Sequence, residues 1–172
     1  MKGSKDMFDF LPASARHVHD YAFIRFDADN WQESICCIIG YDENMRTEVR
    51  STKIKSLTCD ATGNPISATT FSGSTYTFNG QALTEFKDIK GMYHLERAVG
   101  LDRGIIYHLI SHKSFATIGE FSEAISALND KIDTLISPIE VDGKLVGIRH
   151  KTMTARIISA QEVLSLMEAG TM

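Results

Sequence analysis

Two histidines near the start of the chain are the residue types best suited to hold a metal ion. They occur in the string His17-Val18-His19-Asp20, and in an extended segment His17 and His19 lie on one face, as two zinc ligands could. The neighbouring sequence supplies no third ligand at a local spacing. Such a pair near a chain end is more often two exposed imidazoles. The sequence therefore predicts no cofactor, and His17 and His19 are the candidates should a metal bind.

Other catalytic and ligand-binding motifs are missing or incomplete in the sequence. Asp27-Ala28-Asp29-Asn30 resembles the start of a calcium loop but lacks the glycine at the sixth position and the closing glutamate. No P-loop or dinucleotide fingerprint occurs, and Phe71-Ser72-Gly73-Ser74 lacks the leading glycine of a nucleophile elbow. Cys36 or Cys59 with a distant histidine would need a geometry that sequence does not show. An enzymatic role is therefore left open and is not favoured.

The stretch from Leu95 to Lys113 has the spacing of a helix-turn-helix. Such a unit needs a short helix, a glycine that can adopt positive φ at the turn, and a second helix held by spaced apolar residues. Leu95 and Gly100 stand five apart, and Asp102 is a natural N-cap for the second helix. A further helix follows, opened by the capping box Thr117-Ile118-Gly119-Glu120.

With these features, residues 95–128 resemble the phage-repressor type of helix-turn-helix DNA-binding domain. The resemblance implies sequence-specific DNA binding, with the helix from Arg103 to Ile110 in the major groove. The DNA contacts that it implies are made by Arg103, Gly104, Tyr107, His108, Ser111 and Lys113. Among them, Arg103 could donate two hydrogen bonds to a guanine, and Ser111 and Lys113 would lie near phosphates. The chain departs from the family pattern at Glu96, where a small residue is usual.

The charge balance of the chain bears directly on DNA binding. The chain has 18 Lys+Arg against 22 Asp+Glu, and residues 81–136 contain six basic and eight acidic residues. DNA-binding modules are normally basic, because neutralising phosphates supplies much of their affinity. One window without an acidic residue could form a secondary basic stripe on a hairpin, made of Lys144, Arg149, Lys151 and Arg156. The alternative interpretation is a solvated edge strand whose charges prevent aggregation.

Periodicity divides the chain into three regions and predicts an α+β fold. Residues 1–80 predict an N-terminal antiparallel β meander or small barrel-like sheet. The strand-like runs are 21–26, 32–41, 47–58, 66–71 and 75–78. Residues 81–136 follow helical spacing and predict a central helical unit, which is helix-turn-helix-like. Residues 137–172 predict a C-terminal β-hairpin with a type I′ turn at Asp142-Gly143, and a helix opened by the capping box at Ser159. The three regions fold separately or as one domain.

Composition excludes several classes of protein. The 172 residues are 43% hydrophobic, enough for a sizeable core without a disulfide or metal. The longest fully apolar run has five residues, Ile35 to Ile39, so no membrane span is expected. The three cysteines form no C-x-x-C motif, and the first residues lack the apolar core of a signal peptide. Free thiols without an export signal predict a cytoplasmic protein.

We therefore predict a sequence-specific DNA-binding protein, a homodimeric transcriptional regulator from a phage or mobile element. The alternative is a non-catalytic protein-binding factor, such as an inhibitor or an anti-defence protein of the anti-CRISPR kind. The acidic balance favours that alternative, as do Ile105 and Ile110 on the outward face of the second helix. A small enzyme or metal-binding protein is the third interpretation.

Overall fold

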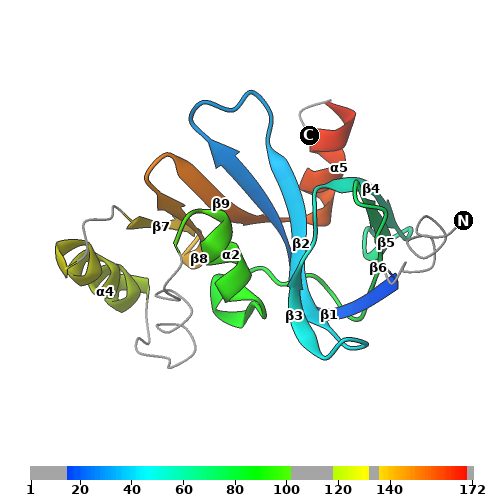
Figure 1. Ribbon diagram of the computed structural model, residues 1–172, viewed down its shortest axis with the longest axis horizontal. Coiled ribbons are helices and arrows are strands. Elements are labelled where there is room, and N and C mark those ends of the chain that lie inside the picture. The colour runs from blue at the N-terminus through cyan, green and yellow to red at the C-terminus, as the bar shows by residue number, and fades with distance from the viewer. Residues whose placement is uncertain (1–14, 102–117, 132–135, 170–172) are drawn as a thin grey trace, which may run out of the picture.

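The computed structural model describes residues 15–101, 118–131 and 136–169 (Figure 1). Within these ranges, nine strands form one mixed sheet, and helices pack on it. The strands are β1 (Ala15–Ala28), β2 (Ile35–Asp42), β3 (Thr47–Arg50), β4 (Ile54–Cys59), β5 (Pro65–Thr70), β6 (Thr75–Phe78), β7 (Ile136–Val141), β8 (Lys144–His150) and β9 (Met153–Ile158). The helices are the 3-10 helix η1 (Phe86–Asp88) and the α-helices α2 (Met92–Ala98), α4 (Ile118–Lys131) and α5 (Ala160–Glu168).

Strand β1 is the longest strand and organises the sheet. One of its edges pairs with β2 in antiparallel register. Its other edge pairs with two strands, one after the other. Strand β6 runs parallel to residues 15–18 of β1, and β9 runs antiparallel to residues 23–28. Strands β5 and β4 continue the sheet beyond β6, β8 and β7 continue it beyond β9, and β3 pairs with β2. Strands from residues 1–80 and from residues 137–172 therefore belong to the same sheet.

Strand β2 and residues 21–26 of β1 bury both of their faces. Along β1, Ala22, Ile24 and Phe26 enter one hydrophobic cluster, while Tyr21 and Phe23 enter a second cluster on the opposite face. Strand β2 alternates in the same way, which places its two adjacent cysteines in different clusters. A strand buried on both faces needs a continuous apolar run rather than an alternating one. This requirement accounts for the apolar sequence of β1 and β2.

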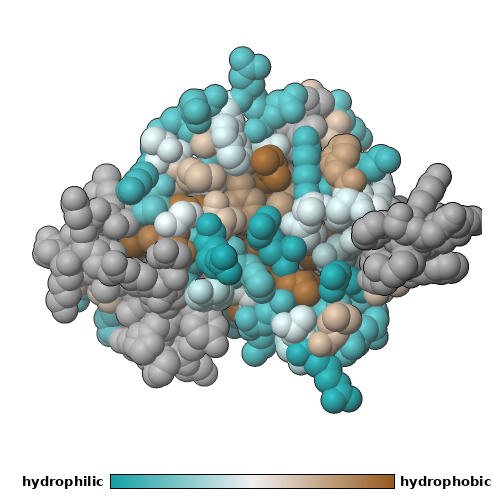
Figure 2. Space-filling view, in the orientation of Figure 1, coloured by the Kyte–Doolittle hydropathy of each residue, from teal (hydrophilic) through white to brown (hydrophobic). Residues whose placement is uncertain are grey.

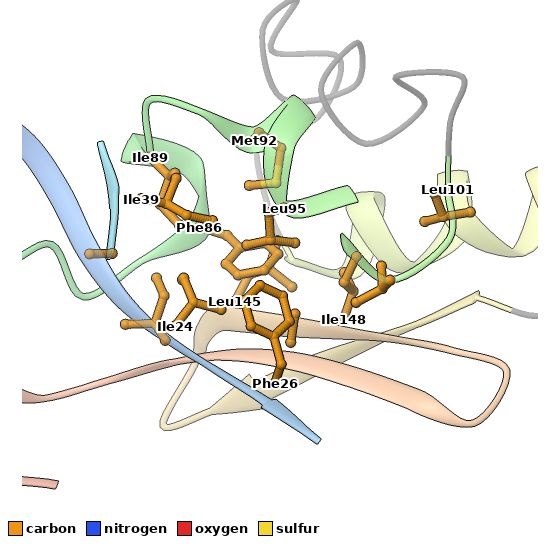
Figure 3. Close-up of a cluster of buried hydrophobic side chains, with 14 of the residues drawn as sticks. Ile24, Phe26, Ile39, Phe86, Ile89, Met92, Leu95, Leu101, Leu145 and Ile148 are labelled. Carbon is orange, nitrogen blue, oxygen red and sulfur yellow. The ribbon is translucent and has the colours of Figure 1, made fainter. Parts of the chain in front are cut away.

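Helices cover both faces of the sheet. Helices α2 and α4 contribute Leu95, Phe121 and Ile125 to the first cluster, whereas α5 contributes Val163 to the second. In the close-up of the first cluster, Phe86 of η1 lies between α2 and the strands (Figure 3). Burying such a side chain fully contributes about 1.5–3 kcal/mol. The helices are therefore fixed to the sheet by apolar contacts.

The predicted fold class is wrong in two respects. Among the described residues strands predominate, and α2 and α4 pack on the sheet instead of forming a central helical unit. The sheet is mixed rather than antiparallel, since β6 runs parallel to β1. Helical periodicity shows that a helix has one apolar face, but it does not show whether that face meets another helix or a sheet. Here Leu95 and Phe121 share their cluster with residues of β1, β2 and β8.

The surface of the described residues is mainly polar in the view of Figure 2, where hydrophobic side chains gather only in small separate groups. Soluble proteins normally expose scattered apolar side chains of this kind. No helix in the part of the chain that the structure describes is long and apolar enough to span a membrane.

Candidate functional site

The turn expected for a helix-turn-helix is present at the end of α2. The amide of Gly100 donates to the carbonyl of Arg97 (3.0 Å), and the amide of Leu101 donates to the carbonyl of Glu96 (2.9 Å). Gly100 has a φ of 87°, the left-handed conformation that glycine adopts without steric cost. This pair of bonds is the Schellman motif, which is normally accompanied by an apolar contact across the turn. Leu101 and Leu95 are buried in the same cluster.

Helix α2 is held against the sheet rather than standing free. A Cβ atom on Gly91, at its N-terminus, would lie 2.6 Å from Cγ2 of Ile39, so only glycine allows this close approach. Nε2 of His94 lies 3.1 Å from the carbonyl oxygen of Glu48 in β3. Glu96, the departure from the family pattern, is fully buried.

The residues that the resemblance assigns to DNA contact lie outside the described ranges. These residues are Arg103, Gly104, Tyr107, His108, Ser111 and Lys113. Their role stays a prediction. The structure describes the residues on both sides of them, and these residues, in α2 and α4, share the first hydrophobic cluster.

The four residues of the secondary basic stripe are described, and two of them already have acidic partners. Arg149 donates to Oδ2 of Asp29 at 2.7 Å, and Arg156 donates to Oε2 of Glu162 at 3.0 Å. The two lysines lie at opposite ends of β8, Lys144 at its first residue and Lys151 in the turn after its last. Seven residues of strand span about 23 Å. The structure therefore brings the two arginines to acids and leaves the two lysines far apart.

A cavity of about 400 Å³ lies between the turn that leads into β5, the segment 81–84 after β6, and the end of β9 with the start of α5. Its lining includes Leu83, Ile158 and the start of α5, where the hydroxyl of Ser159 accepts from the amide of Glu162. Glu162 is the charged residue among its described lining. Oε2 of Glu162 lies 3.5 Å from Nη1 of Arg25 and 3.0 Å from Nη2 of Arg156, so both arginines pair with it. The cavity therefore offers a ligand mainly apolar walls and neutral polar groups.

The two histidines are positioned by a β-bulge in β1. Pairing with β2 is regular up to His19 and resumes at Ala22, with an irregularity between them. Asp20, inside the bulge, has a φ of 47°, which aspartate tolerates better than most residues do. The extra residue of a bulge reverses the alternation of a strand.

The reversal of alternation decides which side chains of β1 face the solvent. Val18 before the bulge and Tyr21 after it both enter the second hydrophobic cluster, although they are three residues apart. His17 and His19 consequently lie on the other face, where their side chains are 39% and 32% exposed. Without the bulge, they would point the same way as Tyr21 and into the core.

Glu43, just after β2, meets both histidines. Nε2 of His17 lies 3.7 Å from Oε2 of Glu43, and Nε2 of His19 lies 4.0 Å from Oε1. The amide of Asn79 donates to Oε1 of the same carboxylate at 3.2 Å. Nδ1 of His17 lies 2.7 Å from the hydroxyl of Thr77 in β6. In the described part of the chain, no three histidine, cysteine, aspartate or glutamate side chains form a group that could hold a metal ion.

Sequence reasoning found the histidines and missed their acidic partners. Nδ1 of His19 lies 2.7 Å from Oδ2 of Asp20, the residue that follows it. Glu43 is distant in sequence, and the amide of Glu43 donates to the carbonyl of His17 at 2.9 Å. Only the register of β1 with β2 reveals this neighbour. The two adjacent strand-like runs predict that β1 and β2 pair, but no sequence pattern predicts the bulge that sets their register.

In comparisons with known proteins, no family model, no curated protein and no solved structure matches this chain.

Proposed function

We propose that this protein is a sequence-specific DNA-binding protein that contacts DNA through residues 95–113. The observation that carries the proposal is the Schellman turn at the end of α2, with Gly100 in the left-handed conformation and Leu101 buried beside Leu95. A helix-turn-helix needs this combination of a glycine turn and a buried residue directly after it.

The packing of α2 and α4 supports the same proposal. Both helices bury apolar side chains in one cluster, including Leu95 of α2 and Phe121 of α4. A recognition element needs rigid support, because base contacts require a side chain held in register with the groove. A homodimer of such units would read two half-sites about 34 Å apart, and we propose that this reading regulates transcription.

The charges of the chain predict an unusual salt dependence for this binding. Only Arg103 and Lys113 are cationic among the six proposed contact residues. Neutralising two phosphates gives a slope of about −2 in log K against log salt for each bound chain. Lys144 and Lys151 add little in this proposal, since they lie at opposite ends of β8. Affinity would then depend on base contacts more than on phosphate contacts.

Selection from a random DNA pool tests the proposal. The parent protein should enrich a sequence with two related half-sites. Arg103→Ala should weaken binding to it by about 5- to 150-fold at the same salt concentration, as expected for losing a bidentate contact of about 1–3 kcal/mol. Lys55→Ala is the matched control, because Lys55 is an exposed cation on β4, away from α2 and α4. If the parent enriches no sequence, or if Arg103→Ala binds as tightly as Lys55→Ala, the proposal is wrong.

A specific observation favours a second candidate, a non-catalytic protein-binding factor. Arg149 and Arg156 have acidic partners, so the positive charge of half of the secondary basic stripe is offset within the chain. The surface then suits a protein partner at least as well as a polyanion. A purified complex with a single protein partner that resists nuclease and is insensitive to Arg103→Ala would favour this candidate over DNA binding.

A further inference from the structure

Asn79 and Gly80 connect the end of β6 to the segment 81–84, and both residues are exposed. Gly80 has no side chain to hinder the approach of its backbone nitrogen to a neighbouring group. A Cβ atom placed on Gly80 would meet nothing within 4 Å. Among the hydrogen bonds of the described residues, none has the backbone amide of Gly80 as its donor. The nitrogen of Gly80 is therefore accessible and unengaged directly after an asparagine.

This arrangement permits an attack on the side chain of Asn79. The backbone nitrogen of Gly80 loses its proton to a solvent base and bonds to Cγ of Asn79, which closes a small succinimide ring. The bond from Cγ to the side-chain nitrogen breaks, and that nitrogen takes up a proton and leaves as ammonia. Water then adds to one of the two ring carbonyls and opens the ring, so that residue 79 becomes aspartate or isoaspartate. We propose that Asn79 is a site of this spontaneous deamidation.

The residue that follows the asparagine, rather than exposure, distinguishes Asn79 from its counterparts. Asn30, Asn44 and Asn64 are also exposed. Pro65 follows Asn64, and proline has no N–H with which to close the ring. Trp31 and Met45 follow the other two, and their side chains crowd their own backbone nitrogens. The amide of Trp31 is also engaged, since it donates to a backbone carbonyl at 2.9 Å.

The carboxylate of Glu43 gives the modification a structural consequence. Nδ2 of Asn79 donates to Oε1 of Glu43 at 3.2 Å. An ionised carboxylate only accepts hydrogen bonds, so deamidation replaces this bond with two like charges, which repel each other. The amide of Asn79 donates to the carbonyl of Val18 (2.8 Å), and the hydroxyl of Tyr21 donates to the carbonyl of Gly80 (2.8 Å). An isoaspartate adds a methylene to the backbone between these two bonds and would disturb both.

Ageing of the purified full chain tests the site. The protein is incubated at mildly alkaline pH and body temperature, and its peptides are followed by mass spectrometry with fragmentation that separates aspartate from isoaspartate. We expect the peptide with Asn79 to gain the mass that distinguishes an acid from an amide, while the peptide with Asn64 stays unchanged. Asn79→Ser should remove the main acidic species seen on ion exchange, and Asn64→Ser should not. The proposal is overturned if Asn79 stays intact, or if it is modified no faster than Asn64.

Variants of residue 79 test the consequence separately from the rate. Asn79→Asp carries the charge of the product, whereas Asn79→Ser loses the bond to Glu43 without gaining a charge. Asn79→Asp should melt a few degrees below Asn79→Ser. The difference should narrow as the salt concentration rises, because salt screens exposed charges, and it should vanish when both variants also carry Glu43→Gln. If Asn79→Asp melts with Asn79→Ser at low salt, the repulsion from Glu43 is overturned.

Discussion

Replacing Gly40 by alanine should destabilise the protein through the bulge in β1. Asp20 and Tyr21 both lie opposite Gly40, because the register passes directly from His19 to Ala22. A Cβ atom on Gly40 would lie 2.7 Å from Cβ and 3.0 Å from Cα of Tyr21. Both atoms are part of or attached directly to the backbone, so rotation of a side chain cannot relieve the overlap. The two strands would have to move apart.

The size of the effect follows from the cost of overpacking. An extra carbon in a fully packed site typically costs about 1–3 kcal/mol, and both partners here are in buried strands. For a chain of this length, each kcal/mol lowers the melting temperature by about 2–4 °C. We therefore expect Gly40→Ala to lose about 2 kcal/mol of unfolding free energy and about 4–8 °C.

Urea unfolding and thermal melting followed by circular dichroism measure this loss. Gly73→Asn is the matched control, since nothing lies within 4 Å of a Cβ at Gly73 and asparagine tolerates its positive φ. The control should change the free energy of unfolding by less than about 1 kcal/mol. A Gly40→Ala variant that melts with the parent would show that Tyr21 does not press on Gly40, and the account of the bulge would fail.

Three further predictions concern the two cores and the last helix. Phe86→Ala should cost about 3–5 kcal/mol in urea unfolding, because Phe86 is fully buried. Ser159→Ala should cost about 1 kcal/mol, since it removes the hydrogen bond that caps α5; Ser159→Asp should restore it. Burial raises the pKa of Cys36 to about 12 and that of Cys37 to about 11, so at pH 8.5 a thiol reagent should modify Cys59 first. Below about pH 8.5, where the thiols of the unfolded chain remain protonated, this contribution to the free energy of unfolding should be constant. It should be lost as the pH rises through the pKa values of the two thiols in the folded protein. A series of melting temperatures at alkaline pH without such a decline would contradict the burial of these two thiols.

Most individual elements could be predicted from the sequence, because they depend on local chemistry. The capping box at Ser159 begins α5 as expected. The turn between β7 and β8 has positive φ at Asp142 (51°) and Gly143 (79°), as a type I′ turn requires. The helix expected from the capping box at Thr117 is α4, which begins at Ile118. Each of these signals involves residues within four positions of one another.

The arrangement of these elements and the meeting of Glu43 with the two histidines could not be predicted. The parallel pairing of β6 with β1 depends on contacts between residues such as Arg16 and Tyr76, which no local pattern connects. The run 47–58 is two strands, β3 and β4, which pair with different neighbours. Glu43 joins the histidines only because of the register between β1 and β2 and the bulge at Asp20.

The double pairing of one edge of β1 also bears on the order in which the protein folds. Its pairing with β2 connects segments that are close in sequence, whereas Phe23 pairs with Ile158 near the other end of the described chain. Contacts of such long sequence separation form slowly, because a long loop must close before they contribute. During synthesis, the edge of β1 that receives β9 stays unpaired until β9 has left the ribosome. We expect nascent or truncated chains without β9 to be the species most prone to pair with one another through that edge.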